Sequence, residues 1–285
     1  MTTAEALKDD LALMSVTGTP ALRTFAPWVL DHLPLVAFHS IRSLAKQAGV
    51  NPNTVTRLAK ELGYAGFDAL RADVQTLLHS PAPTYGDRAR SLRAQVDGNG
   101  FAGMIAANRE NAEQLFAPEI LEVLESCVAP LLNARRVHVV GVRSCYAIAH
   151  HFAYVGGMAF SNFADVPSLP GSIIDQMSQV GEDDIVVAIT YAHYSAEVVA
   201  ACAVARENGA RILALTDSHA APIAVGAWKV LRLPMAGPHF VPSLNTAFLA
   251  VEMLLGGMAV RSDDASDNVT RFENRIRSAG GYVEG

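Results

Sequence analysis

The chain has 285 residues, a length that favours two domains at roughly 150 residues per domain. Apolar residues make up 51% of the chain and charged residues 18%, which is enough for a sizeable core and excludes disorder of the whole chain. Each apolar run is broken by a charge, a glycine or a proline well before the ~20 residues that a bilayer span needs. We therefore expect no membrane helix.

The cysteines and the N-terminus indicate the compartment. Cys127, Cys145 and Cys202 are odd in number, widely spaced and without a Cys-x-x-Cys pair, which argues against a disulfide framework or a zinc knuckle. Residues 1–14 contain charged side chains where a secretory signal needs an uninterrupted apolar stretch. The sequence predicts a reduced, cytoplasmic protein.

Charge is distributed unevenly along the chain. The net charge is −6, but residues 20–72 carry +3, so the remainder carries −9. A solvated helical surface often produces such a difference, so charge alone does not identify a domain that binds nucleic acid.

Up to about residue 80, apolar residues recur at three- and four-residue spacing, which predicts helices. One helix presents an apolar face from Leu22 to Leu33 and is expected to end at Pro34. Two short helices follow, joined by a tight turn. Ser40 is the expected N-cap of a helix over 41–48, and Asn51 that of a helix over 53–62.

A tight turn between two short helices is typical of a helix-turn-helix, in which the second helix enters the major groove of DNA. Its core is expected from Leu44, Ala45, Val50, Val55 and Leu58. Asparagine and arginine can read base edges, whereas threonine and lysine more often hold phosphates. The candidate DNA-binding residues are Arg42, Asn51, Asn53, Thr54, Thr56, Arg57 and Lys60. An ordinary helical hairpin with a polar face remains the alternative from the pattern alone.

After residue 80 the pattern changes. Residues 80–100 are rich in proline, glycine and charge and predict a linker, with a helical turn near 88–96. Two helices are expected between 101 and 133. Beyond them, short apolar strands alternate with helices. Strands are expected at 137–140, 185–189, 212–215 and 230–233, with a weaker candidate at 163–166, and helices at 145–160, 172–180, 195–208, 222–227 and 243–261, followed by a helical tail.

Unbroken apolar strands that alternate with helices predict a parallel sheet covered on both faces, a doubly wound α/β domain. We expect a helical DNA-binding domain over residues 1–79, a linker over 80–100 and an α/β effector-binding domain over 101–285.

In an open parallel sheet, ligands bind beyond the carboxyl ends of the strands, where loops lead into helix N-termini. Two such loops, 141–145 and 190–195, follow expected strands, and the backbone N–H groups at the helix starts would attract an anion. Their candidate effector-binding residues are Arg143, Ser144, Cys145, Thr190, His193 and Ser195, with Ser243 at the start of the last sheet-covering helix. The alternative is that Ser195 only caps a helix and His193 is an ordinary loop residue.

Residues 20–74 resemble the DNA-binding domain of the RpiR family of bacterial transcriptional regulators. The resemblance rests on Gly49-Val50, Thr54-Val55, Arg57, Leu62-Gly63-Tyr64 and Gly66-Phe67. In that family a C-terminal sugar isomerase (SIS) domain, a flavodoxin-like doubly wound fold, follows the helix-turn-helix. The resemblance implies that this chain binds operator DNA and senses a sugar phosphate or a related acid.

The sequence departs from the SIS pattern at both pocket loops. In the typical Gly-x-Gly-x-Ser loop, Arg143 replaces the second glycine and Cys145 the serine. In the typical Ser-x-Ser-Gly-x-Thr-x-Glu loop, Ala192 and His193 replace the second serine and the glycine, while Glu197 is kept. Because two potential cations stand where glycine is typical, a carboxylate, sulfonate or phosphonate is as admissible as a phosphate.

No cofactor, metal site or catalytic constellation is expected. His150 and His151 are adjacent on a helix and point to different faces, which makes them poor joint metal ligands. The leading hypothesis is a ligand-responsive regulator that forms a homodimer or homotetramer, because one helix-turn-helix covers only one half-site. The alternatives are a sugar-phosphate isomerase or lyase, with His193 and Glu197 as its acid–base candidates, and an adaptor that does not bind DNA.

Overall fold

The computed structural model describes residues 4–79, 84–94, 100–169, 171–219 and 221–283. The chain divides into two compact units, Met1–Ala82 and Pro83–Gly285. Within the described ranges, no helix combines the length and the apolar character needed to cross a membrane.

The N-terminal unit is helical, as the apolar spacing predicts. Its described helices are α1 (Ala4–Thr17), α2 (Pro20–Asp31), α3 (Leu33–Phe38), α4 (Ile41–Ala48), α5 (Pro52–Glu61) and α6 (Phe67–His79). Their apolar faces meet in one core, in which Phe25, Leu44, Val55 and Leu58 are each about 1% exposed. Val50, also expected in this core, is half-buried and packs against it.

Local signals fix the two helices of the helix-turn-helix. The hydroxyl of Ser40 accepts a hydrogen bond from the Ser43 N–H at 3.3 Å, and the amide oxygen of Asn51 accepts one from the Asn53 N–H at 2.9 Å. Gly49 ends α4 in the left-handed conformation, with a φ of +66°. Both predicted N-caps are therefore confirmed.

The helix that was expected to reach Pro34 is shorter than predicted. It ends at Asp31, and Pro34 lies in the first turn of α3, which begins at Leu33. Proline lacks an N–H group, and the first turn of a helix is the one place where that group has no intrahelical partner. Pro34 therefore helps to begin a helix instead of ending one.

The C-terminal unit is built around a parallel sheet. Its strands lie in the order β1 (Val137–Gly141), β2 (Ile185–Ile189), β3 (Arg211–Thr216) and β4 (Lys229–Arg232). On the other edge of β1, the weak strand expected at 163–166 is reduced to one parallel bridge between Val137 and Phe163. The chain thus crosses from one side of β1 to the other between Phe163 and β2, which makes the β1–β2 pair the topological switch point.

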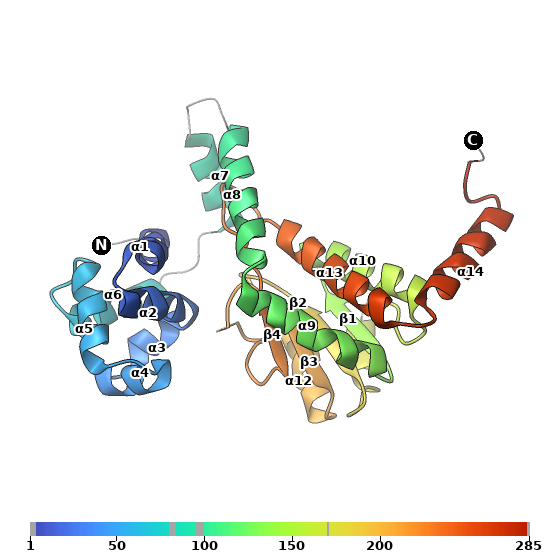
Figure 1. The fold of residues 1–285 in the computed structure, drawn as a ribbon, viewed down its shortest axis with the longest axis horizontal. Helices are drawn as coiled ribbons and strands as arrows, with labels where there is room; N and C mark the ends of the chain where they lie inside the picture. The colour runs from blue at the N-terminus through green and yellow to red at the C-terminus, as the bar shows by residue number, and fades with distance from the viewer. Residues whose placement is uncertain (1–3, 80–83, 95–99, 170, 220, 284–285) are drawn as a thin grey trace. The chain divides into compact units, whose positions relative to one another are not determined.

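Helices cover both faces of this sheet, so the doubly wound α/β prediction is confirmed (Figure 1). One apolar core joins α9 (Pro118–Asn133), α10 (Ser144–Ala159) and α13 (Asn245–Arg261) to one face. A second joins α11 (Ser172–Met177) and α12 (Ala196–Glu207) to the other. The remaining described helices are α7 (Tyr85–Ala94), α8 (Gly100–Leu115) and α14 (Ala265–Ser278).

Two segments differ from the sequence prediction or add to it. The helix expected over 222–227 is a succession of turns with three-residue bonds, from the Ala224 N–H to Ala221 and from the Ala227 N–H to Ala224, and Gly226 adopts a left-handed φ of +71° that an α-helix does not contain. The expected linker over 80–100 contains the ten-residue helix α7.

A buried carboxylate ties the start of β1 to the turn before β2. The Asp184 side chain is fully buried and accepts hydrogen bonds from Arg135 Nε and the Gly181 N–H, both at 2.9 Å, as well as from Arg135 Nη2. Burial by itself would raise the pKa of Asp184, but the bonds from Arg135 and Gly181 outweigh it and hold the pKa below its usual value of 3.8.

Replacing Asp184 with asparagine should lower the free energy of unfolding at pH 7 by about 2–4 kcal/mol, because the change removes the charge that partners Arg135. The carboxylate contributes fully above its usual pKa and loses its contribution as the pH falls through the lowered, folded-state pKa. Urea unfolding should therefore show the gap in unfolding free energy between wild type and Asp184→Asn closing as the pH falls below 3.8. The exposed neighbour Asp183 provides a control, since Asp183→Asn should change the free energy of unfolding little. A difference between wild type and Asp184→Asn that does not depend on pH would contradict the assignment of a stabilising charge to Asp184.

Candidate functional site

The outer face of α5 carries the polar side chains that the sequence assigns to DNA. Asn53, Arg57 and Lys60 are exposed, and Thr54 and Thr56 are half-buried, while the opposite face of the helix lies in the core. The Arg57 side chain is 56% exposed, and its Nε lies 3.7 Å from the Glu61 carboxylate. A surface pair of this kind is worth little, so it leaves Arg57 available to another anion at small cost.

Two further candidates flank this face. Arg42 is exposed in the first turn of α4. Asn51 is exposed at the start of α5, and its amide oxygen is used in the cap bond with the Asn53 N–H. Asn51 therefore has a structural task that fixes where α5 begins, whichever other contacts it makes.

The second candidate site lies where β1 and β2 end. The loops that follow these neighbouring strands meet through side chains: Arg143 Nη1 donates to the Ser195 hydroxyl at 3.1 Å and to the Glu197 carboxylate at 3.0 Å. The Ser195 hydroxyl itself donates to Glu197 at 2.9 Å. The structure therefore brings Arg143 and Ser195 together, as predicted for one pocket, and adds Glu197 as the acceptor between them.

Thr190 stabilises the second loop from within. Its buried hydroxyl accepts a hydrogen bond from the Ser195 N–H at 2.9 Å, which closes the loop before α12 begins. Because Thr190 is 4% exposed and Ser195 7%, both hydroxyls lie beneath the surface of the loop.

A small cavity of about 40 Å³ lies between the two loops. It is lined by Tyr85, Val142, Arg143, Ser144, Cys145, Thr190, Tyr191, Ala192, His193, Ser195, Val241, Pro242 and Leu244. Six of the seven candidate effector-binding residues are in this lining. Ser243 lies outside it and donates a hydrogen bond at 3.0 Å to Asn108 of α8.

Sequence reasoning missed two aromatic residues of this cavity. Tyr85 comes from α7, far from both loops in sequence, and no motif points to it. Tyr191 occupies a variable position of the loop pattern, yet it is 5% exposed and its buried hydroxyl has no hydrogen-bond partner in the described structure. Such a hydroxyl costs free energy unless it meets a water molecule or a polar ligand.

The sulfur in the cavity wall is not a reactive thiolate. Burial raises the pKa of Cys145 to about 11, so the thiol is neutral at ordinary pH. The two adjacent histidines have aromatic neighbours: His150 stacks between Tyr146 and Tyr154, and His151 contacts Phe248. In the ranges that the structure describes, no cluster of three or more acidic, histidine or cysteine side chains could hold a metal ion.

Arg143 has an unusual backbone. Its φ of +53° and ψ of −128° lie in a region that suits glycine, and Arg143 is the residue that precedes α10. This conformation turns the chain from β1 into the helix, and any side chain at this position is strained.

Two family models match the chain. Residues 16–81 match the helix-turn-helix domain of the rpiR family, and residues 130–256 match the SIS domain. Among curated proteins, the chain is similar to the HTH-type transcriptional regulator HexR of Pseudomonas aeruginosa. The two are 27% identical over 224 residues, which are 75% of this chain and 74% of HexR.

Two solved structures are similar in fold. The sugar isomerase domain of an RpiR transcription factor from Sphaerobacter thermophilus is 25% identical, has a TM-score of 0.55 and covers 64% of this chain and 99% of that chain. The Vibrio vulnificus NanR protein, solved in complex with ManNAc-6P, is 18% identical, also has a TM-score of 0.55 and covers 96% of this chain and 98% of that chain. At that identity NanR shows a likeness of fold alone.

Arg143→Gly should be more stable than Arg143→Ala by about 1 kcal/mol. Both changes remove the exposed ion pair with Glu197, which contributes at most about 1 kcal/mol, but only glycine also relieves the backbone strain. Urea unfolding of the two variants beside wild type measures the difference. Equal stability of the two variants would show that the left-handed backbone at this position carries no strain.

Proposed function

Because the chain belongs to the rpiR family of helix-turn-helix proteins that carry a SIS domain, we propose that it is a transcriptional regulator that binds operator DNA and senses a sugar phosphate or a related acid. The observation that carries this proposal is the presence of both domains in one chain. HexR, a named transcriptional regulator, aligns with 75% of this chain. The N-terminal unit supplies DNA binding, and the C-terminal unit supplies ligand binding.

In this proposal α5 is the recognition helix. Support comes from its exposed polar face and from the caps that fix its start. Asn53 and Arg57 are assigned to base edges, and Thr54, Thr56 and Lys60 to the phosphate backbone, with Arg42 and Asn51 at the edge of the contact. One such helix covers one half-site, so we propose a homodimer or homotetramer on a two-fold or repeated operator.

The effector is assigned to the cavity at the ends of β1 and β2. The helices α10 and α12 begin there, and their positive N-terminal ends favour an anionic group. Arg143 supplies a cation, and the hydroxyls of Ser144 and Tyr191 suit the polar groups of a sugar. NanR, a protein of this fold, was solved with ManNAc-6P, which makes a sugar phosphate the first class to test.

Glu197 sets a condition on that effector. Its carboxylate already accepts hydrogen bonds from Arg143 and Ser195, at the position that an anionic group would take. An acidic effector therefore competes with Glu197 for the Arg143 guanidinium. This competition distinguishes an anion from a neutral sugar, since a neutral ligand would leave the Arg143–Glu197 pair in place.

We propose a regulator in preference to a sugar-phosphate isomerase or lyase. An isomerase needs an acid–base pair positioned over one substrate, and the candidates here are His193 and Glu197. The Glu197 carboxylate is paired with Arg143, and the exposed His193 ring packs against Tyr85. Neither side chain is arranged to exchange a proton with the other.

DNA binding distinguishes two side chains on α5. Arg57→Ala should lose sequence preference together with affinity, by about 1–3 kcal/mol for a lost base contact, whereas Lys60→Ala should weaken binding to all sequences and flatten the salt dependence. Fluorescence anisotropy with operator and scrambled DNA over a range of salt concentrations measures both effects. An Arg57→Ala variant that binds operator as tightly as wild type would exclude α5 as the recognition helix.

Mutation of Arg143 and mutation of Glu197 should change the affinity for an anionic effector in opposite directions. Arg143→Ala should weaken binding of an anionic effector by roughly 10- to 150-fold, because it removes a charge-assisted hydrogen bond worth ~1.5–3 kcal/mol. Glu197→Gln should strengthen binding, because it removes the competing charge. Calorimetry with ManNAc-6P and a panel of hexose phosphates, each beside its unphosphorylated sugar, measures these changes.

In the same variants, DNA affinity measured without effector should stay close to the wild-type value. This measurement is the control for correct folding of the variants. Preferential binding of an unphosphorylated, uncharged sugar would overturn the assignment of an anion to this cavity.

A further inference from the structure

Tyr85 lines the cavity from outside the two segments that match family models. Its ring lies edge-on against the ring of His193, with the centroids 5.1 Å apart and an interplanar angle of 74°. It belongs to α7, and the two family models match residues 16–81 and 130–256, so neither includes it. This part of the cavity lining therefore comes from the segment between the two matched domains.

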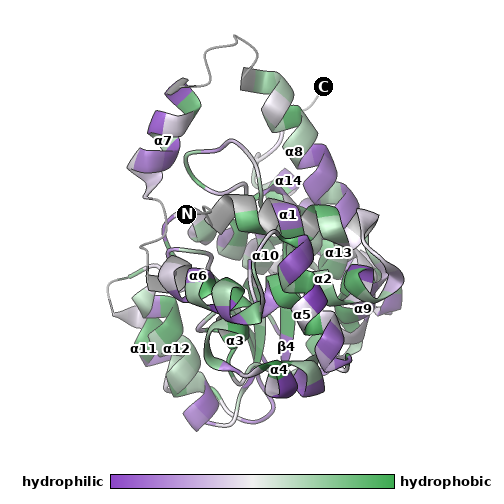
Figure 2. Cartoon of the chain, turned by 90° about the vertical axis from the view of Figure 1, so that its left-hand side faces the viewer, coloured by the Kyte–Doolittle hydropathy of each residue, from purple (hydrophilic) through white to green (hydrophobic). Residues whose placement is uncertain are grey.

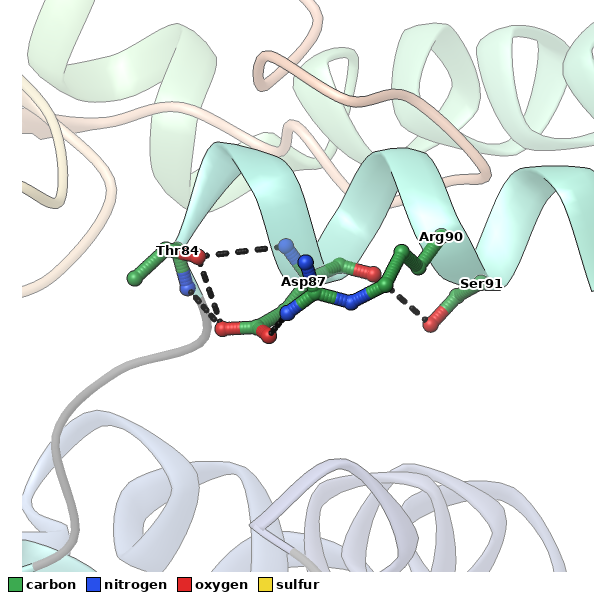
Figure 3. A network of polar contacts seen from close by, with 4 residues as sticks. All are labelled: Thr84, Asp87, Arg90 and Ser91. Carbon is green, nitrogen blue, oxygen red and sulfur yellow. Dashed lines mark hydrogen bonds and ion pairs between the residues drawn. The ribbon is translucent and has the colours of Figure 1, made fainter.

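A network of polar contacts fixes the first turn of α7 and hence the position of Tyr85 (Figure 3). The Asp87 carboxylate accepts hydrogen bonds from the Thr84 N–H at 2.9 Å and from its hydroxyl at 2.7 Å, and the Asp87 N–H donates to the Thr84 hydroxyl at 3.1 Å. This reciprocal arrangement is a capping box, completed by an ion pair between Arg90 and Asp87. The contacts lie within α7 and its cap, so they hold the helix together without attaching it to the sheet.

The helix itself buries little. None of the described residues from Thr84 to Arg93 is buried, and α7 is largely hydrophilic (Figure 2). A helix of ten residues without a buried apolar face is marginally stable, so α7 depends on its cap and on the contact that Tyr85 makes. Segments of this kind open at small cost in free energy.

The cavity is too small for a sugar phosphate as it stands. Its 40 Å³ is about the space of one water molecule, whereas pockets for small organic ligands measure roughly 300–1,000 Å³. Enclosing such a ligand within this lining therefore requires a wall to move. The wall from β1 and β2 is anchored by buried strands and by the Thr190–Ser195 bond, and Leu244 packs against the apolar core. Tyr85, which is 42% exposed, is the lining residue carried by an element without buried residues of its own, and we expect that element to move at least cost.

We propose that Tyr85 is a lid on the effector cavity, and that an anionic effector displaces it from His193 and releases α7. This inference rests on the proposed function, since it concerns the same cavity. Because α7 directly follows the DNA-binding unit in the chain, its release couples occupancy of the cavity to the segment that joins the two units. A ligand that binds only when the lid is open shifts the population toward the open state.

Whether mutation of Tyr85 raises or lowers the effector affinity tests the proposed lid. If Tyr85 must leave before the effector binds, Tyr85→Ala should tighten binding of ManNAc-6P by about two- to tenfold, the equivalent of one aromatic contact. Asp87→Ala should act in the same direction, because it loosens the cap without lining the cavity. Ser91→Ala removes only the bond from its hydroxyl to the Asp87 carbonyl, which is outside the capping box, and should leave the affinity unchanged. Calorimetry on the full chain measures all three variants, with inorganic phosphate as a second probe.

Proteolysis tests the release of α7 directly. Arg88, Arg90 and Arg93 are tryptic sites on this helix, and ManNAc-6P should accelerate cleavage at them several-fold in wild type. In Tyr85→Ala, cleavage should already be fast without ligand. Cleavage at Arg277 of α14 should be the same with and without ligand, as a control.

The outcomes separate the two claims. Weaker or unchanged binding by Tyr85→Ala, or protection of the α7 sites by ligand, would overturn the lid while leaving the effector site intact. A wild-type chain that binds neither a sugar phosphate nor inorganic phosphate would overturn the proposed function, and the lid with it.

Discussion

The order of strands in the parallel sheet is the constraint on which the candidate effector site depends. Pairing β1 with β2, with the Phe163 bridge on the other edge of β1, places the loops after these two strands at one end of the sheet. Residues about 50 positions apart in sequence thereby come within hydrogen-bond distance, as Arg143 and Ser195 do at 3.1 Å. The buried Asp184 secures the opposite ends of the same two strands.

Within this frame, one substitution changes the character of the pocket. A glycine at position 143 would leave an open loop around backbone N–H groups, whereas Arg143 brings a guanidinium into the opening and keeps the left-handed backbone that glycine would suit. The side chain is held by Glu197 and Ser195, so the pocket contains its own counter-charge. In the function proposed here, cavity, cation and carboxylate together make binding of an anionic effector an exchange of partners and not a simple addition.

Much of the fold could be predicted from local chemistry. Ser40, Gly49 and Asn51 act on their own neighbours in sequence, so the limits of α4 and α5 follow from residue type alone. The buried strands β2 and β3 are short apolar runs that need no long-range information to recognise. The segment 222–227 and Pro34 were misjudged because proline is compatible with more than one local structure, and its neighbours decide which one forms.

The sequence by itself determined the two-part organisation of helical and α/β segments, the helix caps and the two loops with polar side chains, because these features depend on residues close together in the chain. Only the tertiary structure decided what those side chains do. It paired Arg143 with Glu197, left the buried hydroxyl of Tyr191 without a partner and set Tyr85 against His193. Such contacts join positions that no local pattern relates, since they arise from how separate elements pack and from which groups are withdrawn from water.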